Sequence, residues 1–160
     1  GVEFIEAKSD IKEIVFDIRK EKNPCSLCAN LRRGVINSVA VREGCNKIAL
    51  GHNQDDVLET FLLNLFYAGN IGTFSPVSYM DRSGITLIRP FVYTPEKDTK
   101  RFIKKNNLSV MPKVCPMDGT SKRESMKQLI FTLRKDIPMI RANLFGAIQR
   151  NLWQGKRDVP

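Results

Sequence analysis

The sequence contains no long apolar run. No stretch of apolar residues approaches the roughly eighteen that a membrane-spanning helix requires. The first segment, GVEFIEAKSD, also lacks the charged and then apolar layout of a secretory signal. It has no initiator Met and resembles the end of a strand, so we expect the chain to be part of a longer one. Without a secretion signal, we interpret the protein as cytoplasmic and expect its cysteines to bind metal or act in redox chemistry.

Histidine and cysteine are scarce, with one His and four Cys in 160 residues. Cys25 and Cys28 form a CxxC motif in the first turn of an expected helix, where the helix dipole favours thiolates. Cys115 lies far away in the proline-rich loop PKVCPMDG. Three cysteines can ligate three irons of a four-iron cluster and leave the fourth iron open, whereas zinc requires a fourth ligand. Cys45 precedes an expected buried strand and is predicted to be a small buried hydrophobe.

Positive charge dominates, with a net charge of +9 and a pI of about 9.6. Such a balance favours polyanionic partners, nucleic acid first, although a basic surface without a partner remains the alternative. At least twelve basic residues lie in the last 64 positions: Lys97, Lys100, Arg101, Lys104, Lys105, Lys122, Arg123, Lys127, Arg134, Lys135, Arg141 and Arg150. This clustering predicts a phosphate-binding surface, whereas a solvated charged face is the simpler interpretation.

The order of expected elements predicts an α/β fold with a mainly parallel sheet and flanking helices, of the Rossmann type. We expect a single domain over residues 1–160, with a helical C-terminal segment over about residues 121–160. Ser9 is expected to cap the first helix, and Thr94 and Pro95 to begin the fourth. Strands or extended pieces are expected at residues 4–8, 46–52, 77–80, 85–88 and 108–111, and helices at 9–20, 26–43, 54–68, 95–106, 121–134 and 136–151.

The segment GHNQDD (51–56) lies at the turn from a strand to a helix, where α/β proteins bind ligands. His52, Asp55 and Asp56 crowd this helix start, and capping accounts for one or two such residues. The two acids together can hold Mg²⁺ on a nucleotide. Arg32 follows Cys28 by one helical turn and shares its face, either as a solvated side chain or as a cation beside a metal site and a phosphate-bearing ligand.

These motifs together resemble one enzyme family. CSLCANLRRG, KIALGHNQDDVLETFLLNLFYAG, LIRPFVYTPEKD and a lone later Cys resemble the tRNA 2-thiocytidine synthetases, which are PP-loop ATP pyrophosphatases, over most of residues 3–150. The resemblance implies an adenine-nucleotide alpha-hydrolase-like fold. It also implies that ATP adenylates a cytidine in the anticodon loop of tRNA and that a [4Fe-4S] cluster carries the sulfur. The residues it assigns are Cys25, Cys28 and Cys115 as cluster ligands, Asp56 and Arg32 as catalytic, and His52, Asp55 and Arg89 on the nucleotide side with Asp56.

One departure from the family concerns the phosphate-binding loop. An SGGxDS-type signature is absent, and GNIGTF (69–74) follows a helix and lacks the Ser and the Asp. We expect that loop and the first strands to lie upstream, so that this chain alone is inactive and covers an exposed sheet edge by forming a homodimer. A cysteine desulfurase system is the sulfur donor expected. The alternatives are a zinc-stapled RNA-binding module without catalysis, a tRNA 2-thiouridine synthetase and a thioredoxin-like redox protein.

Overall fold

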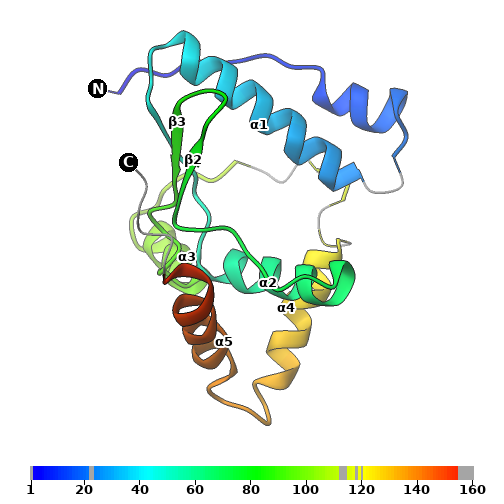
Figure 1. The fold of residues 1–160 in the computed structure, drawn as a ribbon, viewed down its shortest axis with the longest axis vertical. Coiled ribbons are helices and arrows are strands. Elements are labelled where there is room, and N and C mark those ends of the chain that lie inside the picture. Colours follow the sequence, from blue (N-terminus) through cyan, green and yellow to red (C-terminus); the bar gives the residue numbers. More distant parts are fainter. Residues whose placement is uncertain (1, 22–23, 112–114, 118, 120, 155–160) are drawn as a thin grey trace. The chain divides into compact units, whose positions relative to one another are not determined.

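The structure, a computed structural model, describes residues 2–21, 24–111, 115–117, 119 and 121–154. The chain forms two compact units, of which unit 1 comprises Gly1–Ile48 and Tyr79–Thr86 and unit 2 comprises Ala49–Ser78 and Leu87–Pro160. Figure 1 shows the elements along the chain. The single domain expected from the sequence stays a prediction. Within the described residues, we find no helix that combines the length and the apolar character needed to span a bilayer.

Unit 1 contains two helices that contact each other, the π-helix η1 (Glu13–Ile18) and the α-helix α1 (Pro24–Arg42). Val15 of η1 is completely buried. The proline at the start of α1 fits a position that needs no backbone donor. The helix stops at Gly44, which adopts a φ of 68°, and the next N–H, from Cys45, closes the last turn on the Ala40 carbonyl at 2.8 Å. This stop confirms the helix and the terminating glycine predicted from the sequence.

A three-stranded sheet has the order β1-β3-β2. The Thr86 N–H donates to the Asn46 carbonyl at 3.0 Å and the Leu50 N–H to the Ile88 carbonyl at 2.9 Å, so β1 and β3 run in the same direction. A tight turn at Gly84, with a φ of 67°, folds β2 back on β3 as an antiparallel hairpin. The α/β class is therefore confirmed with a mixed sheet, in which one of the two pairings is parallel. The strands are β1 (Lys47–Ala49), β2 (Val77–Met80) and β3 (Ile85–Ile88).

Unit 2 is built around α2 (Gln54–Ala68), which contacts both α4 (Lys122–Leu133) and α5 (Ile140–Ile148). The π-helix η2 (Gln149–Trp153) continues from α5, and α3 (Glu96–Lys105) precedes α4. Trp153 is buried and packs edge-to-face against Phe145, with the two ring centroids 5.6 Å apart. Its indole N–H donates to the Phe74 carbonyl at 3.2 Å. The hydrophobic core joins three residues of α2 to residues of α4, α5 and η2 and to one loop residue, Val92: Val57, Leu58, Leu62, Val92, Met126, Ile130, Phe145, Ile148 and Trp153.

Several local predictions were wrong. Residues 4–8 form no strand, because no strand among the described residues pairs with them and Phe4 is 89% exposed. Residues 108–111, expected as a short extended piece, belong to no helix or strand, and Met111 is exposed. Cys45 is exposed rather than buried, because it lies in the turn that follows Gly44 and precedes the strand. Each segment lacks the packing partner that a short apolar pattern needs in order to become buried structure.

The two predicted helix caps also differ from the structure. Ser9 does not occupy the cap position of the first helix, since helical residues begin at Ile11 and the Asp10 carbonyl accepts from the Ile14 N–H at 2.9 Å. Thr94 does not cap α3 either, because Pro95 occupies the cap position and has no side-chain acceptor. Asp55 of α2 supplies the missing acceptor for the start of α3. The predicted helical segment 121–160 is helical over most of residues 122–153, and residues 155–160 lie outside the described residues.

Candidate nucleotide and metal site

The start of α2 holds Asp56 through a reciprocal cap. The side-chain oxygen of Asn53 accepts from the Asp56 N–H at 3.2 Å, and the Asn53 N–H donates to Asp56 Oδ2 at 2.8 Å. Such a capping box satisfies two backbone donors that the helix start would otherwise leave open. The cap therefore uses only Oδ2 of Asp56, and Oδ1 has a different partner.

Arg123 of α4 takes that second oxygen. Its guanidinium lies 3.2 Å from Asp56 Oδ1, 3.2 Å from Glu59 Oε2 and 3.3 Å from Thr60 Oγ1. One arginine of α4 thus binds three side chains that lie on the same face of α2. These contacts hold α4 against the candidate site. From the sequence, Arg123 is expected only as one of the basic residues, because nothing in the sequence indicates a partner 67 residues away.

Glu59 is the buried member of this group, with 6% of the residue exposed. Burial raises the pKa of Glu59 from 4.5 to about 7, because a carboxylate is poorly solvated inside the protein. The charge of Asp56 acts in the same direction, while the guanidinium of Arg123 lowers the pKa and only partly offsets the burial. Glu59 can consequently hold or release a proton near neutral pH. The only hint in the sequence is an acid among the apolar residues of α2.

Asp55 points to a different part of unit 2. Its Oδ2 accepts from the Glu96 N–H at 2.8 Å and lies 2.7 Å from Nη2 of Arg141. Asp55 therefore supplies the cap that α3 does not obtain from Thr94 or Pro95, and it also binds α5. Its side chain is only 12% exposed, compared with 27% for Asp56. The adjacent acids of GHNQDD thus have different surroundings, and Asp56 is the more accessible of the two.

His52 and Arg89 meet at Phe74. The His52 ring lies 4.8 Å from the Phe74 ring, and the Arg89 guanidinium lies 4.9 Å from the centre of the same ring. The guanidinium of Arg89 also donates to the Ser75 carbonyl at 2.6 Å and to the Ser78 hydroxyl at 3.1 Å. Two of the predicted nucleotide-side residues therefore flank one aromatic ring, and Arg89 is held by the loop that carries this ring.

The candidate metal ligands lie in both units. Cys25 is exposed and Cys28 half-buried in the first turns of α1, where Arg32 follows on an exposed position. Cys115 is exposed in unit 2, on the loop before α4. All three are free thiols, as is Cys45. Within the part of the chain that the structure describes, no three Cys, His or carboxylate side chains form one metal-binding group.

Comparisons with known proteins assign the fold. Residues 5–130 match the PP-loop domain family. The matched range includes the cysteine pair, the GHNQDD segment and Cys115. The chain belongs to the PP-loop family. This match confirms the resemblance seen in the sequence and agrees with the strand–helix arrangement around α2.

Curated relatives of this PP-loop chain are tRNA-cytidine(32) 2-sulfurtransferases. The protein of Syntrophotalea carbinolica is 45% identical over 133 residues, which cover 82% of this chain and 51% of the relative. That of Citrifermentans bemidjiense is 40% identical over 144 residues, covering 88% of this chain and 56% of the relative. The chain therefore spans about half the length of the curated relatives it matches.

A solved structure gives the same fold. The U34-tRNA thiolase NcsA from Methanococcus maripaludis, determined with its [4Fe-4S] cluster, superposes with a TM-score of 0.68 at 25% identity. The match covers 84% of this chain and 45% of that chain. The likeness extends over most of this PP-loop chain, so it includes elements of both compact units.

Proposed function

We propose that this chain takes part in the ATP-dependent thiolation of tRNA, forming 2-thiocytidine in the anticodon loop. The oxygen on the base carbon that is modified attacks the α-phosphorus of ATP, and pyrophosphate leaves. Sulfur at the sulfide level then bonds to that carbon and loses its proton, the carbon–oxygen bond breaks, and AMP leaves with the oxygen. The identity of 40–45% to tRNA-cytidine(32) 2-sulfurtransferases, together with the CxxC motif and the later Cys115, carries the proposal. The prediction that the chain alone is inactive belongs to the same proposal.

Three cysteines form the donor set that we assign to an iron–sulfur cluster. Cys25, Cys28 and Cys115 are free thiols with exposed or half-exposed positions, so each can reach a ligand without disrupting a core. When bound, a [4Fe-4S] cluster held by three thiolates supplies an iron with an open position that can carry sulfur. Zinc needs a fourth ligand, for which the candidates are the exposed thiol of Cys45 and the ring of His52, which packs against Phe74.

Asp56 is the acid that we assign to the chemistry. Its side chain is more exposed than that of Asp55, whose accepting oxygen already binds the start of α3 and Arg141. Asn53 and Arg123 hold the Asp56 carboxylate in one orientation, as a group that must meet a reacting base requires. Asp56 is the candidate to bind the Mg²⁺ that accompanies ATP, because magnesium prefers carboxylate and phosphate oxygens. Asp55, the other acid predicted on the nucleotide side, instead binds Arg141 and the start of α3.

The remaining predicted residues have supporting roles in the proposal. Arg32 is an exposed cation one turn beyond Cys28 and can stabilise negative charge that develops as AMP leaves. His52 and Arg89, whose side chains both contact the Phe74 ring, are assigned to nucleotide binding. Arg123 acts on the reaction through Asp56, as a positioning residue.

The expected partners complete the proposal. The protein would act on tRNA in the cytoplasm and receive sulfur from a cysteine desulfurase system. A homodimer remains a prediction, based on the edge position of β1 in the described sheet. A uridine as the target base is the nearest variant, since the thiolase that shares the fold is a U34-tRNA thiolase.

Metal analysis tests this proposal against the zinc-stapled alternative. The chain is purified without oxygen, reconstituted with iron and sulfide, and assayed for iron, acid-labile sulfide and zinc. We expect about four irons per chain, lost on Cys115→Ser and retained on Cys45→Ser, since Cys45 is also an exposed thiol. Stoichiometric zinc without labile sulfide would contradict the proposal and favour an RNA-binding module.

A further inference from the structure

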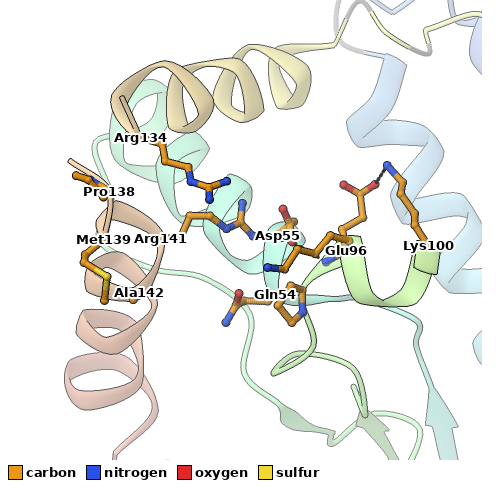
Figure 2. Close-up of a pocket in the computed structure, with 11 residues that line it drawn as sticks. Gln54, Asp55, Glu96, Lys100, Arg134, Pro138, Met139, Arg141 and Ala142 are labelled. Atoms are coloured by element: carbon orange, nitrogen blue, oxygen red, sulfur yellow. Dashed lines mark hydrogen bonds and ion pairs between the residues drawn. The ribbon is translucent and has the colours of Figure 1, made fainter. Parts of the chain in front are cut away.

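A basic pocket of about 430 Å³ lies next to the candidate site, within unit 2. Its volume falls in the range of about 300–1,000 Å³ that is typical of ligand pockets. Figure 2 shows side chains of α3 and α5, and of the residue that follows α4, arranged around the start of α2. The ionisable side chains that line it are Asp55, Glu96, Lys97, Lys100, Arg134 and Arg141.

The two acids of the pocket already have partners. Asp55 binds Arg141 and the start of α3, and Glu96 binds Lys100 at 2.9 Å and Lys127 of α4 at 2.7 Å. Although burial acts in the opposite direction, the hydrogen bonds from these two lysines lower the pKa of Glu96, so it stays charged. The acids therefore hold the pocket together instead of offering an open site for a cation.

Two cations of the pocket remain available. Among the described residues, neither Lys97 nor Arg134 has an acidic side chain within 4 Å, and both are exposed. Figure 2 shows Arg134 reaching toward Arg141 and Asp55, so two guanidinium groups approach one region of the pocket. Four cations against two satisfied acids make the pocket suited to an anion, and guanidinium groups suit phosphate oxygens.

We propose that this pocket binds a phosphate group of an RNA backbone. That the RNA is a tRNA rests on the proposed function, whereas the phosphate site rests on the pocket itself. The basic lining continues along α3, where Lys97, Lys100 and Lys104 recur every three or four residues and so share one face of the helix. Such a row extends beyond what one small anion can use and matches a chain of phosphates.

The lining also indicates backbone rather than base recognition. Its apolar side chains are Pro95, Pro138, Met139 and Ala142, and no described lining residue offers an aromatic ring on which a base could stack. Single-stranded bases are typically held by such rings, while phosphate contacts carry no sequence information. Binding in this pocket should therefore depend on salt and should not discriminate between RNA sequences.

The test compares two double variants of the chain with equal charge loss. Lys97→Gln with Arg134→Gln removes the two available pocket cations. Lys8→Gln with Arg82→Gln removes two exposed cations from unit 1 that have no ion pair among the described residues. Binding to an unmodified tRNA, to an unrelated RNA hairpin and to ATP is titrated at several salt concentrations.

We expect the pocket variant to bind both RNAs on the order of tenfold more weakly at 0.15 M salt, with the slope of log affinity against log salt smaller by roughly 1.4–1.8. The unit 1 variant should stay within about twofold of the unaltered chain, and ATP binding should not change. Equal losses in the two variants, or no RNA binding by the unaltered chain, would overturn the proposal. A loss of ATP binding alone would overturn it in favour of a small-anion site. The phosphate site and the thiolation proposal fail separately, since RNA binding can hold where no thiolated base forms.

Discussion

The free energy of unfolding of the unaltered chain should fall as the pH rises, and replacing Glu59 with Gln should remove this fall. Burial raises the pKa of Glu59 in the folded chain to about 7 from its usual 4.5. Between these two values the folded chain keeps a proton that the unfolded chain releases, so the free energy of unfolding falls with rising pH and levels off above about 7. One pKa unit corresponds to about 1.4 kcal/mol, so the whole difference amounts to about 3 kcal/mol.

Urea unfolding between pH 5 and pH 8 measures this effect. The amide of Gln can still accept a hydrogen bond from Arg123 but carries no charge to desolvate. We therefore expect the free energy of unfolding of Glu59→Gln, relative to that of the unaltered chain, to rise by about 2–3 kcal/mol from pH 5 to pH 8. The exposed Glu6, outside any helix or strand, provides the control, and Glu6→Gln should follow the unaltered chain. Parallel pH curves for Glu59→Gln and the unaltered chain would refute the reasoning.

Two further substitutions test contacts that hold unit 2 together. Arg123→Ala should lower the free energy of unfolding, measured with urea, by about 1–3 kcal/mol because two acids lose a shared partner. As a control, Lys105→Ala at an exposed position should change it by less than about 0.5 kcal/mol. Equal effects of the two substitutions would argue against the role of Arg123. Asp55→Ala should cost about 0.5–2 kcal/mol and increase amide hydrogen exchange at the start of α3, since the Glu96 N–H loses its acceptor. Unchanged exchange there would show that Asp55 does not cap α3.

The elements with strong local signals could be predicted from the sequence. The apolar residues of α2 recur at helical spacing, and Gly69 stops the helix in the left-handed conformation, with a φ of 59°. The turn at Gly84 likewise determined the bounds of the β2–β3 hairpin. In both cases the information lies within a few residues, so periodicity and turn chemistry suffice.

The contacts of the candidate site could not be predicted in the same way. GHNQDD was correctly placed at a strand-to-helix turn, but the different surroundings of Asp55 and Asp56 depend on α3, α4 and α5. Arg123 and Glu59 entered the site only through tertiary packing, which one sequence does not show. The short apolar segment at residues 4–8 failed for a related reason, because a strand requires a partner that sequence pattern alone does not supply.

The central claim is that these residues serve tRNA thiolation. Because the chain spans about half of the relatives, the direct measurement uses a hybrid in which it replaces the matching segment of the Syntrophotalea carbinolica protein. The hybrid is expressed in cells that make no 2-thiocytidine, and their tRNA nucleosides are analysed by mass spectrometry beside cells with the unaltered relative. We expect 2-thiocytidine with the hybrid and its loss on Asp56→Asn. A soluble, iron-containing hybrid that forms no 2-thiocytidine, while the relative does, would contradict it.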